Sequence, residues 1–420
     1  LAGCAAVLWM PASRAEKSYA EHYREAIAAY RAGEAEAFVA AARSARETRP
    51  DSPAAAYLLA AALATADQAE KSLALLDGLA RQGLHYTPAE ESAFASLALA
   101  QNAPGLLQRL QDNGQPVGEA SVTFTLDEGR FVPEGLAWDA KRQRFLLGSV
   151  HQRRVVSIDA DGHVTDFIAP GQDGLLSVFG MQVDARGDSL WLATSGLRES
   201  GDIPDEWRGR AGILQFDLAG GELIQSHWLS PDGREHVLGD LQLLPEGGVL
   251  TTDSLTGEVL RLQPSTGRFE TVVPAGRLVS PQGITLDDDG FFAWVADYRG
   301  GIFRLDLANG SLQKVVEGET THHGIDGLYR RGQWLIAIQN GQRPHRVVAL
   351  QLDSSGLAVT GFEVLAAALP EFDDPNLGVI VDGRFHFNAN SHWPQFDREG
   401  HLPDGLSGPI VMSVPLPGAE

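Results

Sequence analysis

The chain lacks several features that would place it in a common class of protein. It contains one cysteine, Cys4, so no disulfide bond can form within the chain. After the N-terminal segment there is no run of about 20 apolar residues, and the sequence therefore predicts no membrane-spanning helix. Lysine and arginine number 33 against 55 for aspartate and glutamate, which gives a formal net charge of −22. Because phosphate backbones and anionic membranes are bound by clustered basic side chains, this balance argues against a nucleic-acid partner or an anionic-membrane partner.

Three short catalytic motifs are also missing. The sequence contains no Gly-x-Ser-x-Gly nucleophile elbow, no phosphate-binding Gly-x-x-x-x-Gly-Lys loop and no His-Glu-x-x-His zinc helix. Hydrolases built on those motifs are therefore not predicted. Any active site must be sought among residues that the fold brings together from distant positions.

The first fifteen residues resemble an export signal. The tetrapeptide LAGC, which ends at Cys4, is similar to the lipobox of bacterial lipoproteins. In one interpretation Cys4 carries a lipid, and in a second residues 1–15 are the end of an ordinary signal peptide that is cleaved before Glu16. Both predict an exported protein, in the periplasm or as an outer-membrane lipoprotein of a bacterium, with a lipid on Cys4 as its only membrane contact. In a third, the tetrapeptide is a chance match in a cytoplasmic protein.

Residues 16–112 have the pattern of a helical domain. They are rich in alanine, and apolar positions recur at helical spacing in YAEHYREAIAAYRAG and AEKSLALLDGLARQG. Pro53 and Pro88 lie about one tetratricopeptide period apart, and each precedes a new helical segment. The region therefore resembles two to three degenerate tetratricopeptide repeats, whose concave surface would dock a protein partner. We expect residues 113–120 to be a linker.

Residues 121–418 repeat one pattern six times. Each unit opens with an apolar phrase, in most units containing glycine, and continues through β-rich segments joined by polar turns. The units begin at Pro133, Phe179, Gly239, Pro281, Ile325 and Asn376. A period of roughly 40 to 60 residues with about four short strands is typical of a propeller blade. The sequence thus predicts a multidomain protein with an all-α helical-hairpin domain followed by an all-β six-bladed propeller.

Two strand-like segments, residues 121–127 and 409–415, belong to none of these six units. We expect both to lie in the last blade, where they would join the two ends of the propeller. Such a closure leaves no open sheet edge.

Two repeat positions are expected to surround one axial pocket, because the loop entering each inner strand and the tip joining the second and third strands lie on the same face. The first position holds Glu134, Phe179, Gly239 with Asp240, Gln282, Asp326 and Asn376. The second holds Ser149, Ser195, Asp253, Asp297, Asn340 and Asn390. Carboxylate and amide oxygens suit a hard cation such as calcium or magnesium. For any single tip residue, the alternative is that the side chain only caps its own turn.

Three of the opening phrases resemble those of a known family. PEGL from Pro133, SPQGI from Ser280 and GIDGL from Gly324 are similar to phrases of the regucalcin and gluconolactonase family, also called the senescence marker protein type. Its members are six-bladed propellers, and the resemblance covers residues 120–418. It implies a divalent cation near the axis, which we expect to be calcium, and hydrolysis of a lactone or ester.

The resemblance also assigns residues. It implies that Glu134 and Asp326 bind the metal and that Asp326 acts as general base. Gln282 stands where the family has asparagine, and Gly239 stands where it often has a second asparagine, beside Asp240. The predicted metal ligands are therefore Glu134, Gln282, Asp326 and Asp240, with the loss of an amide at Gly239 weakening the set.

Histidines give further candidates for a base near neutral pH. His323, just before Asp326, and His151, on the tip of the first unit, are the preferred pair of catalytic residues, and each has the alternative of a solvated loop residue. The insertion at residues 198–212, which contains Trp207 and Arg210, is expected either to cover the pocket or to be an idle surface loop.

Two functions remain open from the sequence. The first is an exported, metal-dependent hydrolase of a lactone or related ester. The second is a non-catalytic propeller that binds a ligand or protein and docks a partner through its helical repeats. Glu134 and Asp326 favour the hydrolase, because two buried carboxylates without a cation would be costly. Gly239 and Gln282 favour the binding protein.

Overall fold

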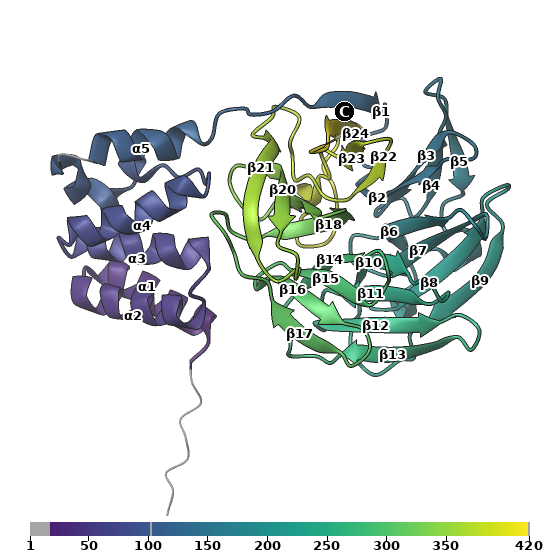
Figure 1. Cartoon of the computed structure of the whole chain (residues 1–420), viewed down its shortest axis with the longest axis horizontal. Helices are drawn as coiled ribbons and strands as arrows, with labels where there is room; N and C mark the ends of the chain where they lie inside the picture. The colour runs from purple at the N-terminus through teal and green to yellow at the C-terminus, as the bar shows by residue number, and fades with distance from the viewer. Residues whose placement is uncertain (1–16, 101–102, 419–420) are drawn as a thin grey trace, which may run out of the picture. The chain divides into compact units, whose positions relative to one another are not determined.

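The computed structural model describes residues 17–100 and 103–418 (Figure 1). The expectations about Cys4 and residues 1–15 fall outside the described residues. The chain forms two compact units: one holds the described residues up to Leu79 together with Thr87–Gln108, and the other holds Ala80–Tyr86 and the residues from Arg109 onward. None of the helices among the described residues is long and apolar enough to cross a membrane. The predicted class, a helical N-terminal part followed by a six-bladed propeller, is confirmed.

The N-terminal part is built from short amphipathic helices around one buried helix. The α-helices are α1 (Tyr19–Ala32), α2 (Ala35–Thr48), α3 (Pro53–Thr65), α4 (Ala69–Arg81) and α5 (Ala103–Asp112). Helix α1 begins with a capping box, in which the Ser18 hydroxyl accepts a hydrogen bond from the Glu21 amide and the Glu21 carboxylate accepts one from the Ser18 amide (2.8 Å). Helix α3 is buried along most of its length, as its alanine and leucine sequence requires.

One predicted helix does not form as expected. The segment after Pro88 folds as two 3-10 helices, Pro88–Glu90 and Ser92–Leu99. Between them Glu91 has an extended backbone (φ −104°, ψ 128°), and its carboxylate accepts a hydrogen bond from the Tyr57 hydroxyl of α3. This tertiary contact accompanies the break, which helical spacing alone does not reveal. The tetratricopeptide resemblance of the region stays a prediction.

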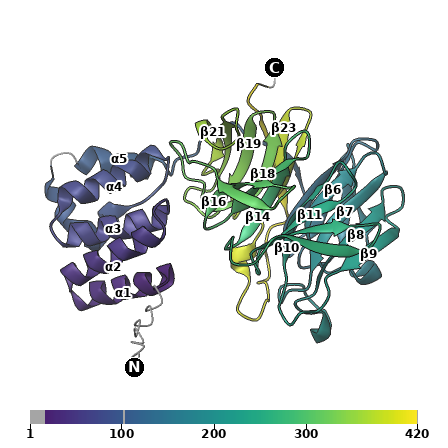
Figure 2. The same ribbon diagram turned by 60° about the horizontal axis from the view of Figure 1, so that its bottom comes forward.

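The propeller consists of six antiparallel four-stranded sheets (Figure 2). The first blade is β2 (Pro133–Asp139), β3 (Arg144–Ser149), β4 (Val155–Ile158) and β5 (Val164–Ile168). The second is β6 (Ser177–Asp184), β7 (Ser189–Ser195), β8 (Ala211–Asp217) and β9 (Leu223–Trp228). The third is β10 (Leu238–Leu243), β11 (Val249–Asp253), β12 (Glu258–Gln263) and β13 (Arg268–Val273). Apolar clusters fill the space between neighbouring blades, and Leu146, Val178 and Leu190 belong to the one between the first two.

The remaining blades complete the ring. The fourth is β14 (Pro281–Leu286), β15 (Phe292–Asp297), β16 (Gly301–Asp306) and β17 (Ser311–Lys314). The fifth is β18 (Ile325–Arg331), β19 (Trp334–Gln339), β20 (Arg346–Leu352) and β21 (Val359–Ala367). The sixth is β22 (Gly378–Val381), β23 (Arg384–Asn388), β24 (Ile410–Pro415) and β1 (Ser121–Thr125).

The ring closes as predicted, because β1 pairs with β24 in the sixth blade and supplies its outer strand. Just before β1, Val117 exchanges two backbone hydrogen bonds of 2.9 Å with Ala367 at the end of β21. Residues 113–120 therefore include a segment that is tied to the fifth blade.

The opening phrase of a unit forms an irregularity in the sheet. In the first five blades the pairing of the first two strands shifts register across this phrase, for example between Pro133 and Leu136 in β2 and between Ile325 and Leu328 in β18. A bulge changes the direction in which side chains project. The register shift explains why the side chains that open these strands reach the axial cavity.

In four of these strands a glycine directly follows the first-position residue, because neighbouring inner strands approach closely there. A Cβ atom at Gly283 in β14 would lie 2.3 Å from the backbone nitrogen of Leu328 in β18.

We expect Gly283→Ala to destabilise the propeller by about 3 kcal/mol, since the backbone of the next blade must move. Gly220→Ala is the control, because its nearest atom would be 3.8 Å away, and it should change the free energy of unfolding by less than about 0.5 kcal/mol. Equal urea midpoints for the two variants would contradict this account.

Candidate functional site

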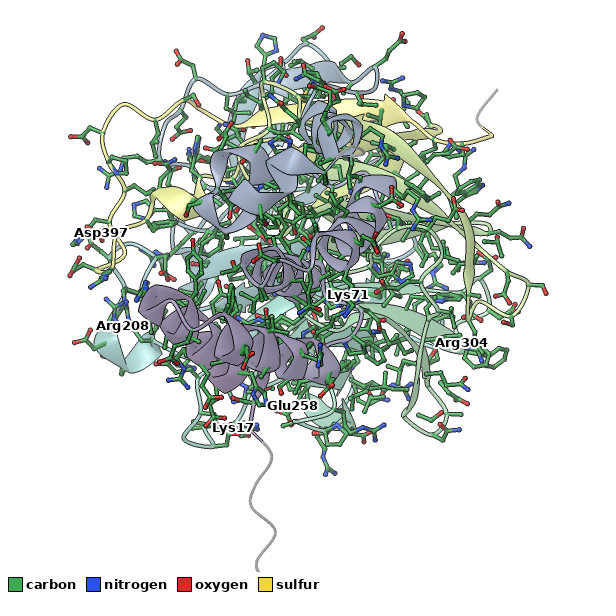
Figure 3. The ribbon with its side chains drawn as sticks, turned by 90° about the vertical axis from the view of Figure 1, so that its left-hand side faces the viewer. Lys17, Lys71, Arg208, Glu258, Arg304 and Asp397 are labelled. Carbon is green, nitrogen blue, oxygen red and sulfur yellow. The ribbon has the colours of Figure 1, made fainter. Side chains whose placement is uncertain are left out.

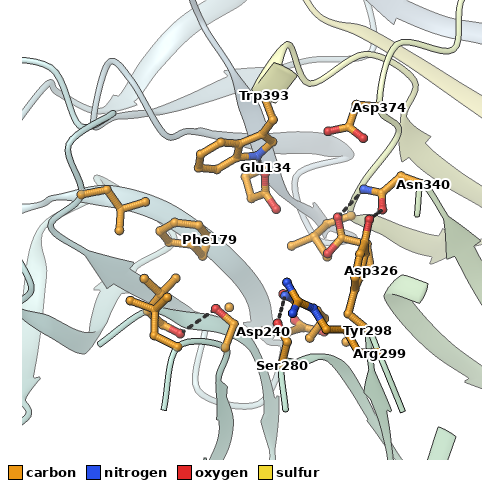
Figure 4. Close-up of a pocket in the computed structure, with 18 residues that line it drawn as sticks. Glu134, Phe179, Asp240, Ser280, Tyr298, Arg299, Asp326, Asn340, Asp374 and Trp393 are labelled. Atoms are coloured by element: carbon orange, nitrogen blue, oxygen red, sulfur yellow. Dashed lines mark hydrogen bonds between the residues drawn. The ribbon is translucent and has the colours of Figure 1, made fainter. Parts of the chain in front are cut away.

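A cavity of about 470 Å³ lies on the propeller axis, between the loops that lead into the inner strands (Figure 4). Its lining includes the first-position residues Glu134, Phe179, Gly239, Asp240, Gln282 and Asp326, together with Asn340. The cavity is also lined by Tyr298, Arg299, Asp374, Leu377 and Trp393, which the sequence did not single out. Four carboxylates thus face one cavity in which Arg299 is the only lysine or arginine among the described lining residues.

Glu134 is held at the centre of the site by two side-chain donors. Its Oε2 atom accepts hydrogen bonds of 2.7 Å from Asn376 Nδ2 and from Trp393 Nε1. Its side chain is buried, and burial together with the nearby Asp326 charge raises its pKa well above the usual range. Among the described residues no group donates to Oε1, so this oxygen is available to a ligand.

Asp326 is oriented by a short relay. Asn340 Nδ2 donates a hydrogen bond of 2.7 Å to Asp326 Oδ2, and the Tyr298 hydroxyl donates one of 2.9 Å to Asn340 Oδ1. Burial and the nearby Asp374 charge raise the pKa of Asp326 to about 7. Burial and the Asp326 charge raise the pKa of Tyr298 as well, so its hydroxyl stays protonated and acts as a donor.

Asp374 is the carboxylate that the sequence analysis missed. It lies in the loop before β22 with a left-handed backbone (φ 60°), and its Oδ2 accepts a hydrogen bond of 3.3 Å from Ser391 Oγ. Burial raises its pKa to about 6. A signal was present, since Asp374 precedes the first-position residue Asn376 by two places.

Asp240 occupies a different place from the other three carboxylates. It stands where four other blades have glycine, and its oxygens accept hydrogen bonds from the backbone amides of Leu241 (2.8 Å) and Ile284 (3.2 Å). Burial raises its pKa to about 7. It also lines a second cavity of about 300 Å³ together with Trp138 and Tyr329. Because both oxygens are already bonded to the backbone, Asp240 is a weaker candidate ligand than Glu134.

Gln282 and Gly239 line the same cavity. Gln282 Nε2 donates to Ser280 Oγ (3.1 Å), which leaves Oε1 without a donor among the described residues. A Cβ atom built on Gly239 would lie 3.4 Å from Gln282 Oε1, at ordinary van der Waals distance. The site therefore holds one amide oxygen without a donor, Gln282 Oε1, and a Cβ atom could be added at Gly239 without a clash.

The tip residues behave mostly as turn caps. Of the second-position set, only Asn340 lines the axial cavity. Asp297 accepts hydrogen bonds from the backbone amides of Val279 (2.6 Å) and Arg299 (3.0 Å), and Asp253 accepts one of 2.6 Å from His236. These carboxylates serve the backbone and a histidine of their own blade.

Neither preferred histidine lines the axial cavity. His151 lines a separate cavity, and its Nδ1 donates a hydrogen bond of 2.9 Å to the Glu199 carbonyl. His323 is buried, with Nε2 at 3.9 Å from Glu317 Oε1. In the insertion the guanidinium of Arg210 lies 5.6 Å from the ring of Trp207, and neither residue lines the cavity, although Leu197 beside the insertion does.

The donor set fits a hard cation, but its carboxylates are spread out. In residues 17–100 and 103–418, groups of three or more His, Cys, Asp or Glu with ligand atoms within 4.8 Å of one another occur at two places, Asp159–Asp161–His163 and His236–Asp253–Glu258. Neither group lies in the axial cavity. A cation there would be bound by fewer carboxylates, with the Gln282 oxygen and water completing its shell.

Comparisons with known proteins return structures alone. No family model and no curated protein matches the chain. A gluconolactonase from Xanthomonas campestris is 20% identical, with a TM-score of 0.47 over 70% of this chain and 89% of that one. An aldose sugar dehydrogenase from Streptomyces coelicolor is 15% identical (TM-score 0.48, 71% and 100%), and virginiamycin B lyase from Staphylococcus aureus is 11% identical (0.47, 71% and 100%). Likenesses of this size do not identify a reaction.

Proposed function

We propose that the axial cavity binds a divalent cation, calcium in the first place, and hydrolyses a lactone or related ester. The convergence of Glu134, Asp240, Asp326 and Asp374 on one cavity with a single arginine carries the proposal. Buried carboxylates that share a small space repel one another and raise one another's pKa values unless a cation neutralises them. The oxygen donors without a thiolate match calcium best.

The proposed roles follow from which oxygens are free. Glu134 Oε1, Asp326 Oδ1 and Gln282 Oε1 would hold the cation, which when bound would polarise a substrate carbonyl. Asp326 would take a proton from the attacking water, since the bound cation would keep its carboxylate ionised near neutral pH. The Asn340 amide fixes the orientation of its carboxylate.

The walls of the cavity suit a compact ring. The rings of Phe179 and Trp393 are stacked with centroids 6.5 Å apart and an interplanar angle of 24°. They provide an apolar surface, while the Arg299 guanidinium provides donors for substrate oxygens. Hydrolysis of a panel of γ- and δ-lactones and aryl esters, with metal-stripped and calcium-reloaded protein, tests the proposal. Hydrolysis without any dependence on added cation would refute the metal requirement.

The pH dependence provides a further prediction. The Asp374 charge helps to raise the pKa of Asp326, so Asp374→Asn should lower that pKa. If ionised Asp326 is the base, the rising limb of kcat/KM should move to lower pH. Asp373→Asn is the matched control, because the Asp373 charge raises the pKa of Asp374 but does not act directly on Asp326. An unmoved limb in Asp374→Asn would remove Asp326 as the base.

The spread of the carboxylates and the missing amide at Gly239 favour a second candidate, a propeller that binds a ligand without catalysis. In it the raised pKa values keep the acids protonated, and the helical part docks a protein partner. Ligand binding that is strongest below pH 6 and indifferent to cations would support this function. Export of the protein stays a prediction in both cases.

A further inference from the structure

A second polar cavity, of about 580 Å³, gathers arginines on the face that carries the blade tips. The residues lining it come from the segment before β2, the β3–β4 tip, the β5–β6 loop, the insertion between β7 and β8, and the loop between β23 and β24. Five of the lining residues are arginines: Arg130, Arg153, Arg154, Arg198 and Arg208. In a chain with a net charge of −22, such a concentration of positive charge requires an explanation.

Among the described residues, most of these guanidinium groups form no ion pair with a carboxylate that lines the cavity, although the Asp202 charge acts on Arg153. Arg154 is paired with Glu128 and with Asp166 (2.7 Å). Among the described residues, Arg153 and Arg198 have no carboxylate oxygen within the 4.0 Å of an ion pair. Arg198 Nη1 instead donates a hydrogen bond of 2.5 Å to the carbonyl of Arg398.

The two remaining arginines are paired only weakly. Arg130 reaches Asp404 at 3.8 Å and Arg208 reaches Asp205 at 3.2 Å. The side chains of both aspartates are almost fully exposed, at 100% and 96%, and neither lines the cavity. Exposed pairs of this kind contribute little, so Arg130 and Arg208 keep most of their capacity to bind an anion.

The walls of this arginine cavity are tied together. The hydrogen bond from Arg198 to Arg398 joins the insertion to the β23–β24 loop, and Arg208 and Asp397 of these loops lie on the same side of the molecule in Figure 3. Arg153 is half-buried in a left-handed backbone conformation (φ 52°), and its carbonyl accepts a hydrogen bond of 2.9 Å from the Gly171 amide. The side chain of Arg198 and the backbone of Arg153 are therefore fixed before any ligand arrives.

We propose that the arginine cavity binds a small oxyanion, a phosphate, sulfate or carboxylate group of a small molecule. Guanidinium groups present paired N–H donors that match the oxygens of such groups. Glu128, Asp202 and Glu399 also line the cavity and would repel a long polyanion, which favours a compact ligand. The arginine cavity and the axial cavity share no lining residue, although Leu197 and Trp393 of the axial cavity lie in the same loops as Arg198 and Glu399 of this one.

Calorimetry of the full chain tests the inference. Pyrophosphate, sulfate and tricarballylate are titrated separately into metal-free protein at constant ionic strength, with chloride as the reference anion. We expect at least one of the three to bind with one site per chain. The double variant Arg153→Gln, Arg198→Gln should weaken binding at least about tenfold. The control Arg186→Gln, Arg268→Gln removes the same charge from exposed positions and should bind as the parent does.

The outcomes distinguish the chemical class of the anion, and they distinguish the arginine cavity from the axial cavity. Preference for pyrophosphate, sulfate or tricarballylate identifies a phosphate, sulfate or carboxylate ligand. No binding by any of the three, or equal loss in the control, would overturn the inference. Thermal melts show whether the variants are folded. Because calcium is absent from these titrations, a failure here leaves the axial proposal untouched, and the reverse also holds.

Discussion

Replacing Glu134 by glutamine and Asp326 by asparagine together is expected to abolish calcium binding and lactone hydrolysis. Both changes remove a negative charge while keeping the shape of the side chain. Glutamine at position 134 keeps an oxygen that accepts the hydrogen bonds from Asn376 and Trp393. The metal-free variant should therefore fold, and it should melt at a higher temperature than the parent at pH 8, because two mutually repelling carboxylates are gone.

The control for this variant is Glu246→Gln, Asp289→Asn, which removes the same charge from two exposed residues outside the cavity. It should bind calcium and hydrolyse substrate as the parent does. Hydrolysis in the axial double variant at more than about a tenth of the parental kcat/KM would contradict the assigned roles.

Calcium is expected to stabilise the protein strongly at pH 8 and weakly at pH 5. Burial raises the folded-state pKa values of Asp240 and Asp326 to about 7 and that of Asp374 to about 6, above the ordinary value of 3.8. A carboxyl group whose pKa is raised on folding stabilises the protein while it is protonated, and this stabilisation is lost as pH rises from about 4 through 7. The metal-free protein should therefore melt about 5 °C lower at pH 8 than at pH 5.

Cation binding reverses this loss, because a cation requires ionised ligands and binds only the folded chain. Scanning calorimetry at pH 5 and pH 8, with chelator and with saturating calcium, measures the difference. A calcium-induced shift of equal size at both pH values would contradict the prediction. A shift retained in the Glu134→Gln, Asp326→Asn variant would place the cation elsewhere, and the buried group His236–Asp253–Glu258 would then be the next position to examine.

The propeller fold could be predicted from the sequence because the same strand-opening phrase recurs in every unit. The opening phrase, with its glycine and its register shift, marks the inner strand of a blade, and a Cβ atom on Gly283 would meet the next blade at 2.3 Å. A phrase of this kind opens each of the six units, although the register shift occurs in the first five blades, and with two further strand-like segments these phrases define a closed ring. The break at Glu91 was not accessible, since it accompanies a contact with Tyr57 from another helix.

The site was accessible only where it follows the repeat. Glu134, Gln282 and Asp326 were found because they share one position in their blades and line one cavity. Asp374 and Trp393 reach that cavity from the loop entering β22 and from the tip between β23 and β24, but neither stands at one of the two compared repeat positions: Asp374 lies two residues before Asn376, and Trp393 lies three residues after Asn390.

The repeat position of a residue also does not reveal whether its side chain points toward the axis or away from it. Asp253 and Asp297 share a repeat position with Asn340, yet they bond to groups of their own blade, because unpaired backbone amides at the tips need acceptors. Asp240 was grouped with the metal ligands from its place beside Gly239. Its bonds to the amides of Leu241 and Ile284 became visible only in three dimensions.

Isothermal calorimetry of calcium binding to the metal-stripped full chain at pH 8 tests the central claim most directly. The account predicts one site of micromolar affinity that disappears in the Glu134→Gln, Asp326→Asn variant and persists in Glu246→Gln, Asp289→Asn. Absence of binding by calcium, magnesium, manganese and zinc to the parent protein would contradict the account and favour the propeller that binds a ligand without a cation.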